Sequence, residues 1–303
     1  MKSVEWHEAV RIATAVEAPS AFGIHRRFTK ALGSCDWPSS VTGGVGCEFG
    51  ENGIIWLEPD TFNSKAFSTP IARLHQRLKT VPTNFAATVD ALDDSELVCT
   101  RLIGQPRDAL AAFQREGWRI TATNLVFYRL SSFCGPDLPM PAGFEVRIRA
   151  LHEEPFSLSE INRLLAMANE AYFPDRFSLD PRINPVAARN RFSRVIHSAL
   201  KGALVSHIIV STFDGEPASF QFFDIDRKAG MAGRWLTAFV NPQHQARHLG
   251  RGVFMRAVNA PVFKGLNWTW SAYLGNLASV EAYHLLGFRI AHFTHDLHRW
   301  RTR

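Results

Sequence analysis

The sequence predicts an α/β protein with a mixed twisted sheet and helices on both faces, built as two domains. Three observations predict this architecture. The 303 residues are 46% hydrophobic and contain no long polar tract, so the chain can bury more than one core. Segments with strand and helix periodicity alternate along the sequence. A stretch rich in proline and glycine, residues 131–143, separates two such series.

The proline- and glycine-rich stretch marks the predicted domain boundary. Its sequence, SSFCGPDLPMPAG, holds three prolines and two glycines, which interrupt any periodic pattern and favour an extended connection. We therefore divide the chain into an N-terminal domain (residues 1–135), a linker (136–144) and a C-terminal domain (145–303).

The N-terminal domain contains three predicted elements next to this boundary. Residues 96–103 have the pattern of a strand, residues 105–116 that of a helix opened by proline and closed by glycine, and residues 118–130 that of a second strand. Residues 19–50 are rich in Gly, Ser and Pro, and we assign no element there.

In the C-terminal domain two helices follow a first strand at residues 145–151. The first helix begins with a capping box of Ser157 and Glu160, and the second begins at Asn184 and Pro185. Their predicted buried residues are Leu158, Ile161, Leu165, Ala168 and Tyr172 in the first helix, and Phe192, Val195, Ile196, Ala199 and Leu200 in the second.

Strands and helices then alternate to the end of the chain. Asp214 and Gly215 tolerate positive φ angles and predict a tight hairpin. The remaining predicted elements are strands at 207–213, 216–225, 234–240 and 268–274, helices from about residue 249 and at 276–286, and a last strand after Gly287. This order implies a mixed sheet with helices on both faces.

Two segments of the chain are similar to each other. Residues 102–120 (LIGQPRDALAAFQREGWRI) and 273–290 (YLGNLASVEAYHLLGFRI) both have the pattern strand, glycine, helix, glycine, strand. An internal duplication explains this pattern, and so does the general use of glycine to end a helix before a strand. In a duplication, Phe113 would take the place of Tyr283 and would lack its hydroxyl.

Charge and composition exclude several classes of protein. Residues 1–140 contain 14 basic and 15 acidic residues, whereas residues 141–303 contain 20 and 13. The basic second half suits a phosphorylated small molecule, and we expect no nucleic-acid partner because there is no dense Lys/Arg run or nucleic-acid-binding motif. The four cysteines form no C-x-x-C pair, so we expect no metal site.

The sequence also predicts where the protein is found. Charged side chains interrupt residues 1–18, unlike in a signal peptide, and no segment approaches the roughly 18 apolar residues of a membrane span. We expect a cytoplasmic protein without membrane insertion. Tryptophan-rich strands near the C-terminus are compatible with a homodimer.

The segment VNPQHQARHLGRG at residues 240–252 leaves a predicted strand and enters a helix near Gly250. Such a turn aims backbone N–H groups and the positive helix terminus at an anion, and Arg247 and Arg251 add charge that suits a pyrophosphate. An ordinary helix start flanked by arginines has the same pattern, so this segment alone does not decide between the two.

A second segment has the spacing Asn276-x-x-Ser279-x-x-x-Tyr283-x-x-x-Gly287. On a helix these positions share one face, so an amide, a hydroxyl and a phenol could line one groove. The alternative is a helix whose Asn276 caps the N-terminus and whose Tyr283 is half buried.

Together, in this order and about 35 residues apart, the two segments resemble the acetyl-CoA signature of the GNAT superfamily of N-acetyltransferases. In that family a strand ending in Val-x-Pro leads into a loop Gln/Arg-x-x-Gly-x-Gly/Ala that holds the pyrophosphate. Counted from Val240, the best register places residues 245–250 on this loop, with His248 in place of the first glycine. A shifted register, residues 247–252, restores both glycines but needs two more loop residues. The resemblance implies a GNAT-like domain preceded by a smaller, degenerate GNAT-like domain.

The resemblance further implies acetyl-CoA as the acyl donor and no metal. Tyr283 would face the thioester sulfur as general acid, since a phenol with a pKa of about 10 can protonate a departing thiolate and is itself protonated at pH 7. For the general base we expect a water relayed towards Asp224, Asp226 or a histidine. The implied cofactor-binding residues are Phe239, Val240, Gln245, Ala246, Arg247, His248, Leu249, Gly250, Arg251, Asn276 and Ser279.

A narrower resemblance concerns the acceptor. A partial GNAT-like domain, a connector and a full domain resemble the dTDP-fucosamine N-acetyltransferase family, which implies the amine of a nucleotide-linked amino sugar as acceptor. Arg176, Phe177 and Asp180 carry this resemblance and are implied to bind substrate, although a salt-linked loop at the sheet edge also explains Arg176 and Asp180. Two other functions are open: acyl transfer to another amine (aminoglycoside, amino acid, polyamine or natural-product intermediate), and a non-catalytic acyl-CoA-binding module.

Overall fold

The computed structural model describes most of the chain. The described residues are 2–4, 44–103, 107–131, 140, 142–172, 174–227, 230–245 and 249–301, with the backbone alone for 2–4, 50, 77, 107 and 234–237. Within these ranges, no helix is both long enough and apolar enough to cross a membrane.

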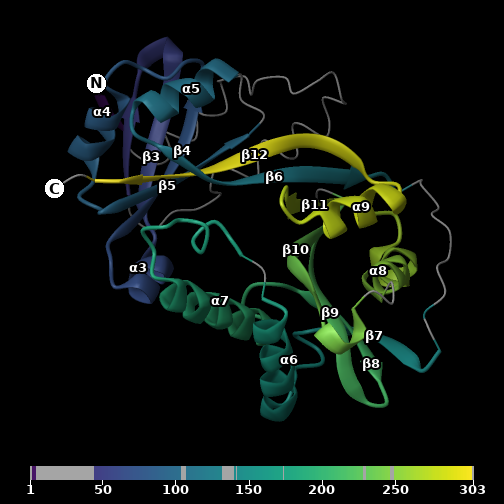
Figure 1. Ribbon diagram of the computed structural model, residues 1–303. Helices are drawn as coiled ribbons and strands as arrows, with labels where there is room; N and C mark the ends of the chain where they lie inside the picture. The colour runs from purple at the N-terminus through teal and green to yellow at the C-terminus, as the bar shows by residue number, and fades with distance from the viewer. Residues whose placement is uncertain are drawn as a thin grey trace. The chain divides into compact units, whose positions relative to one another are not determined.

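Twelve strands of the described residues form one mixed sheet, which confirms the predicted fold class (Figure 1). The elements of the first half are β1 (Lys2–Val4), β2 (Val45–Glu48), η1 (Gly50–Asn52), β3 (Gly53–Pro59), α3 (Thr61–Phe67), β4 (Ile71–Leu78), α4 (Phe85–Leu92), β5 (Leu97–Ile103), α5 (Arg107–Arg115) and β6 (Arg119–Arg129). Those of the second half are β7 (Phe144–Ala150), α6 (Leu158–Glu170), α7 (Pro185–Leu200), β8 (His207–Phe213), β9 (Glu216–Asp226), β10 (Met231–Val240), η2 (Pro242–His244), α8 (Leu249–Asn259), η3 (Pro261–Phe263), β11 (Asn267–Tyr273), α9 (Leu277–Leu285) and β12 (Arg289–Trp300).

The strand order is symmetric. It runs β1-β2-β3-β4-β5-β12-β6-β11-β10-β9-β8-β7. If this order is read backwards, and each strand from β1 to β6 is exchanged with the strand whose number is six higher, the same order results. The two halves of the chain therefore have the same topology, with β6 and β12 exchanged. β12 lies beside β5, to which it pairs from Thr294 with Ile103 through Trp300 with Leu97.

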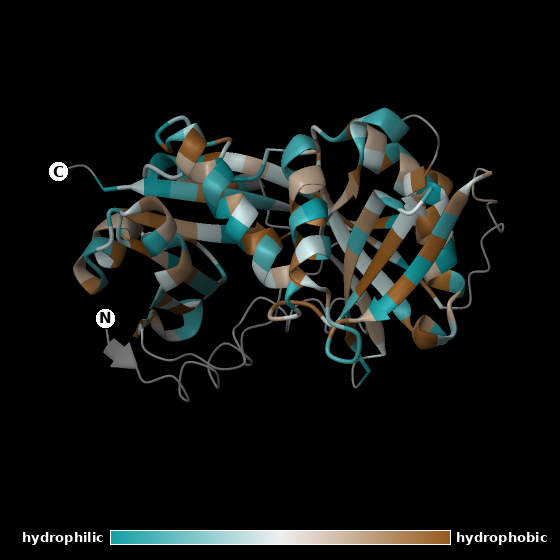
Figure 2. Ribbon diagram, turned by 90° about the horizontal axis from the view of Figure 1, so that it is seen from below, coloured by the Kyte–Doolittle hydropathy of each residue, from teal (hydrophilic) through white to brown (hydrophobic). Residues whose placement is uncertain are grey.

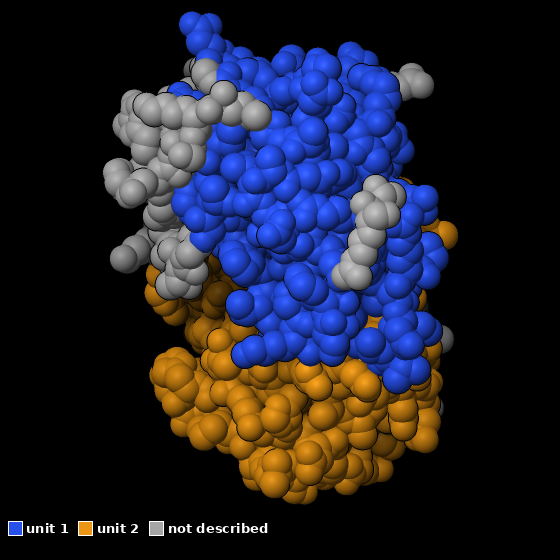
Figure 3. All heavy atoms as spheres, turned by 90° about the vertical axis from the view of Figure 1, so that its left-hand side faces the viewer, with its two compact units in different colours: residues 1–124, 176–187, 292–303 blue, residues 125–175, 188–291 orange. Residues whose placement is uncertain are grey.

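The described chain forms two compact units, coloured separately in Figure 3. Unit 1 consists of residues within 1–124, 176–187 and 292–303, and unit 2 of residues within 125–175 and 188–291. These units differ from the predicted continuous domains 1–135 and 145–303. The difference arises because most of β12 pairs with β5 and because the segment between α6 and α7 packs in unit 1.

Both faces of the unit 2 sheet are covered by helices. Phe222 and Phe223 are adjacent in β9, so their side chains point to opposite faces. The core beneath α6 and α7 contains Ile161, Phe192, Ile196, Phe220, Phe222 and Phe239. The core beneath α8 and α9 contains Phe223, Val253, Phe254, Trp268, Trp270, Tyr283 and Phe288. The helices carry both hydrophobic and hydrophilic residues, as helices with one buried and one exposed face require (Figure 2).

Unit 1 has its own core beside α4 and α5. Its members include Leu57, Leu74, Phe85, Val89, Val98, Phe113, Trp118 and Leu297. The Phe85 and Phe113 rings meet edge to face with centroids 5.2 Å apart, and Phe113 meets Trp118 in the same way at 5.6 Å.

Several predicted determinants of secondary structure are confirmed. Ser157 and Glu160 form the capping box of α6. All five predicted residues of the α7 stripe are buried. Asp214 and Gly215 take φ angles of 50° and 82° in the turn between β8 and β9. Leu158 is a correction, because it is 68% exposed at the start of α6, whose buried face runs through Leu164 and Met167 instead.

Candidate functional site

β10 and β11 run parallel for three residue pairs and then diverge. The last pair is Gly233 with Thr269. β10 continues to Val240 and β11 to Tyr273, and no further pair joins them in the described chain. The strands therefore open towards their carboxyl ends, which is the end at which open α/β sheets bind ligands.

A bulge bends β10 at the level of this opening. Trp235 lies opposite Phe222 of β9, and Phe239 lies opposite Phe220, so four residue steps of β10 match two steps of β9. Bulges bend and twist a strand locally and are frequent beside active sites. The bulge thus gives β10 a course different from that of β11.

The connection from β10 to α8 is fixed at its beginning. The backbone N–H of Asn241 donates to the carbonyl of Ala218 at 2.9 Å. The ring of His244 packs edge to face on Phe144, with centroids 5.4 Å apart, and also contacts Phe213 at 5.5 Å. The connection that precedes the predicted pyrophosphate loop is therefore packed against β7 and β8.

The predicted loop, residues 245–250, leads into α8. Gln245 is exposed, and residues 246–248 (Ala, Arg and His) lie outside the described residues. Leu249 is buried and holds the first turn of α8 against the core. Beside Gly250 no described atom lies within 4 Å of the position a Cβ would take, so its backbone can be approached closely. Arg251 follows with a partly exposed side chain.

Gln221 connects the sheet to this helix terminus. It is only 2% exposed, and it lies on β9 between Phe220 and Phe222, opposite the bulge. Its amide Nε2 donates to the carbonyl of Gly250 at 3.3 Å. Its Oε1 has no hydrogen-bond partner among the described residues. Gln221 was not predicted as a site residue from the sequence. The only indication of its role there is an amide side chain inside the run ASFQFF.

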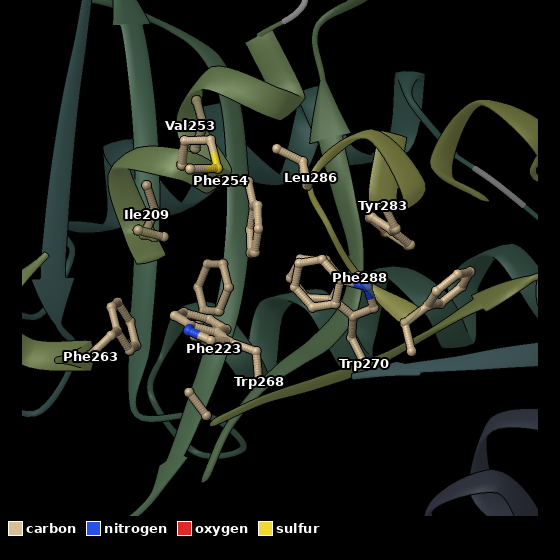
Figure 4. Packing of buried hydrophobic residues seen from close by; sticks show 14 of the residues in the cluster. Ile209, Phe223, Val253, Phe254, Phe263, Trp268, Trp270, Tyr283, Leu286 and Phe288 are labelled. Carbon is tan, nitrogen blue, oxygen red and sulfur yellow. The ribbon is translucent and has the colours of Figure 1, made fainter. Parts of the chain in front are cut away.

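Tyr283 lies in the aromatic cluster beneath α8 and α9 (Figure 4). Its ring centroid is 4.5 Å from that of Trp270 and 5.2 Å from that of Phe127, and the residue is 4% exposed. Trp270 is the first residue of β11 beyond its last pair with β10. Tyr283 is therefore placed beside the opening, not on an outer helix face.

The same tryptophan connects Tyr283 with α8. The ring of Phe254 lies 4.2 Å from Trp270 between centroids. Phe254 stands five residues after Leu249, which is about 7.5 Å along the helix axis. The start of α8 and the phenol thus border one aromatic cluster, which supports the predicted association of the two segments.

Asn276 caps α9, as in the alternative that the sequence left open. Its side-chain oxygen accepts from the backbone N–H of Ser279 at 3.2 Å. Gly287 ends the helix with a φ of 76°, and the N–H of Phe288 donates to the carbonyl of Tyr283 at 3.0 Å. Asn276, Ser279 and Tyr283 lie on α9 or its cap as predicted, while Gly287 lies beyond its end.

Phe239 and Val240 can reach a ligand mainly through their backbone. The Phe239 side chain is fully buried in the core beneath α6 and α7, where it stacks on Phe220. Val240 pairs with Ser219 of β9. Asp224, one of the expected sites for the general base, is exposed and lies opposite Gly233, where the strands begin to diverge.

Arg176, Phe177 and Asp180 lie in the segment that packs in unit 1. The Arg176 guanidinium donates to Asp296 at 3.3 Å, and Phe177 is fully buried. Asp180 accepts from His298 Nδ1 at 2.7 Å and from Trp300 Nε1 at 2.9 Å. These contacts match the salt-linked loop of the alternative interpretation. Arg176 keeps 23% of its side chain exposed, so it can meet a substrate more readily than the other two.

Burial acts to raise the pKa of Asp180, but hydrogen bonds from His298, Trp300 and the Arg182 backbone outweigh it, so the pKa lies below its ordinary value. Burial lowers the pKa of His298 despite the neighbouring carboxylate. The pair is therefore a neutral imidazole donating to a carboxylate at neutral pH. It is a structural contact, with no solvent access at His298.

Comparison with solved structures identifies the fold. No protein-family model and no curated protein matches the sequence. A GCN5-related N-acetyltransferase from Sphaerobacter thermophilus is 12% identical, with a TM-score of 0.56 over 90% of this chain and 85% of that one. Another from Kribbella flavida is 15% identical, with a TM-score of 0.54 over 92% and 96%. A tandem GNAT protein from the clavulanic acid biosynthesis pathway is 13% identical, with a TM-score of 0.55 over 98% and 94%.

At these identities the comparisons establish the fold alone. They agree with the features described above: a mixed sheet, two halves of equal topology, and helices on both faces of the unit 2 sheet. The chain therefore has the fold of the GNAT N-acetyltransferases, in a tandem form that extends over nearly its whole length.

Proposed function

We propose that the protein is an acyl-CoA-dependent N-acetyltransferase that moves an acetyl group from acetyl-CoA directly to a primary amine, with Tyr283 as the general acid. The observation that carries this proposal is the opening between β10 and β11 with Tyr283 beside it. An extended pantetheine arm can lie between the diverging strands, where it would bring its thioester next to the phenol.

The start of α8 supports an anion at the other end of the donor. Backbone N–H groups at a helix N-terminus attract phosphate, and no described atom lies within 4 Å of the position beside Gly250 that a Cβ would take. Arg251 adds a positive charge in the same turn. We assign the pyrophosphate of acetyl-CoA to this terminus and to the loop before it.

The chemical step balances without a covalent enzyme intermediate. The amine nitrogen attacks the thioester carbonyl carbon, and the C–S bond breaks after the C–N bond forms. The departing thiolate takes the Tyr283 proton, and the surplus proton of the amine passes to a water, from which the phenolate is protonated again.

For the acceptor we propose the amine of a nucleotide-linked amino sugar. The excess of basic residues after residue 140 suits a substrate with a diphosphate. The sequence predicts Arg176, Phe177 and Asp180 as contact residues; Phe177 and Asp180 are buried, and only Arg176, with 23% of its side chain exposed, has surface to offer a substrate. A panel that includes aminoglycosides, amino acids and polyamines would identify another acceptor if this assignment fails.

Release of free CoA from acetyl-CoA in the presence of each amine tests the proposal. We expect Tyr283→Phe to lower turnover by about 10²- to 10⁴-fold, because it removes only the proton donor. Tyr128→Phe is the matched control, because it also deletes one hydroxyl. Its neighbour in β6, Phe127, contacts Tyr283, and successive side chains of a strand point to opposite faces. The Tyr128 side chain therefore points to the face of the sheet away from Tyr283. Equal turnover of the two variants would exclude Tyr283 as the general acid, and no CoA release with any amine would exclude acetyl transfer.

A further inference from the structure

Unit 1 contains the same arrangement of strands and helix that forms the candidate site in unit 2. β4 and β5 run parallel for four pairs, from Ile71 with Leu97 to Leu74 with Thr100. β4 then continues to Leu78 and β5 to Ile103, with no further pair between them in the described chain. α4 follows β4 as α8 follows β10. By position, the N-terminus of α4 is therefore the counterpart of the proposed pyrophosphate site.

The helices that follow β5 and β11 end identically, which confirms the internal similarity seen in the sequence. In α5 the N–H of Trp118 donates to the carbonyl of Phe113 at 3.1 Å, and in α9 the N–H of Phe288 donates to that of Tyr283 at 3.0 Å. The glycine between them has a positive φ in both cases. This is the same C-terminal motif in both units, so the two helix ends can be matched residue by residue.

This match exposes two differences that bear on ligand binding. Phe113 stands where unit 2 has Tyr283, so the hydroxyl is missing. Glu116 stands before its glycine where unit 2 has Leu286. Leu286 is buried in the core beneath α8 and α9, whereas Glu116 carries a charge.

The Glu116 carboxylate occupies the N-terminus of α4. Its Oε2 accepts from the backbone N–H of Ala86 at 2.9 Å. Ala86 is the second residue of α4, as Gly250 is the second residue of α8. Asn84, at the cap position, makes no side-chain cap hydrogen bond, so Glu116 supplies the anion that a helix N-terminus favours.

We propose that the Glu116 carboxylate takes the place of a ligand phosphate at the N-terminus of α4 and so prevents acyl-CoA from binding to unit 1. The chain then binds one acyl-CoA, at α8. The proposal rests on the proposed function for the location of the site in unit 2. The contact between Glu116 and α4 does not depend on that function. A phosphate would have to displace a carboxylate that is tied to the same chain, and its negative charge would be repelled by it.

Thermal unfolding of the full chain with and without inorganic pyrophosphate tests the contact. We expect Glu116→Leu to lower the Tm, because α4 loses its cap, and pyrophosphate to raise the Tm of this variant more than that of the unchanged protein. Glu116→Gln keeps an acceptor and should unfold near the original Tm. Glu51→Leu, a change at an exposed position in the same unit, is the charge-matched control and should behave like the unchanged protein. Equal responses of Glu116→Leu and the unchanged protein would overturn the proposal.

Calorimetric titration with acetyl-CoA separates the two proposals. One equivalent bound supports both. Two equivalents would overturn the closure of unit 1 and leave the proposed function intact. No binding would overturn the proposed function, while the pyrophosphate experiment would still decide the role of Glu116.

Discussion

Gln221 is a buried polar residue whose position only the folded chain explains. Its amide lies inside the sheet of unit 2, opposite the β10 bulge, and donates to the carbonyl of Gly250. A carbonyl in the first turn of a helix would otherwise be bonded only within the helix, so this contact fixes the direction in which the start of α8 points. A buried amide is costly to keep unless it serves such a contact, and Oε1 has no partner among the described residues.

We predict that Gln221→Leu weakens acetyl-CoA binding without removing the chemistry. A hydrogen bond of about 0.5–1.5 kcal/mol corresponds to a change of about 2- to 10-fold, which we expect in the KM for acetyl-CoA. The kcat should change little, because the hydrogen bond of Gln221 is to the backbone of α8 and not part of the proposed chemical step. Steady-state kinetics measures both.

Ser211→Ala is the control for this prediction. The Ser211 hydroxyl bonds that of Ser219 at 2.6 Å, and both are fully buried on the face of the sheet that carries Gln221. The control loses a buried hydrogen bond but no contact with α8. An unchanged KM in Gln221→Leu, or the same rise in both variants, would show that Gln221 does not position the helix.

At the scale of the element, α9 combines a structural and a proposed functional role in one residue. Asn276 caps the helix by accepting from the N–H of Ser279. The resemblance to the GNAT superfamily implies that Asn276 also contacts the pantetheine arm. The two roles use different atoms, because capping needs the side-chain oxygen and the amide nitrogen is the group that can donate to a ligand.

We predict that Asn276→Ala lowers the free energy of unfolding by about 0.5–2 kcal/mol, the usual effect of losing a helix cap. Asn276→Asp keeps an oxygen at the cap and should preserve stability. It replaces the amide donor by a carboxylate, so it should weaken acetyl-CoA binding. Denaturant unfolding and a binding titration of the two variants measure these effects separately.

If Asn276→Asp binds acetyl-CoA as well as the unchanged protein does, Asn276 is a cap and nothing more. If Asn276→Ala unfolds at the same denaturant concentration as the unchanged protein, the cap contributes no measurable stability. Each outcome contradicts one role and leaves the other standing.

At the scale of the whole molecule, patterns within a few residues predicted helices, strands and turns, but they did not predict which distant strands pair. The capping box at Ser157, the Asp214-Gly215 turn and the α7 stripe depend on residues a few positions apart, and all three are confirmed. The exchange of β6 and β12 depends on which distant strand each one meets. No short sequence pattern predicts which strands pair, because the edges of all strands present the same backbone N–H and C=O groups.

The elements between residues 44 and 92 could not be predicted for a related reason. β3 reads GIIWLEP and is buried at its first five residues, so the alternation that identifies a half-exposed strand is missing. The candidate site was predicted in part. The spacing of Asn276 and Tyr283 is a helical pattern that the sequence displays, whereas the opening between β10 and β11 and the position of Gln221 arise only when three strands and α8 meet.

Buried histidines give the whole molecule a predicted pH dependence. Burial lowers the pKa of His207, His292, His295 and His298 below the ordinary value of 6.5. Below that value the unfolded chain binds protons that the folded chain does not, so folding loses stability as the pH falls. Asp180 and Asp296 also make the folded chain less stable as the pH falls, but over a lower range of pH. Burial opposes their ionisation, but hydrogen bonds and arginine or histidine neighbours outweigh this effect and lower their pKa.

We therefore predict that the free energy of unfolding is smaller at pH 5 than at pH 7.5, as measured by denaturant titration at constant ionic strength. His298→Gln retains a donor for Asp180 but cannot be protonated, so it should reduce the dependence on pH. His284→Gln is the control, since His284 is exposed and is not among the groups that shift the pKa of these four histidines. Three of the four histidines lie in unit 1, so its unfolding should respond to acid more than that of unit 2. Stability that is constant or rises towards pH 5 would mean that these imidazoles are protonated in the folded chain.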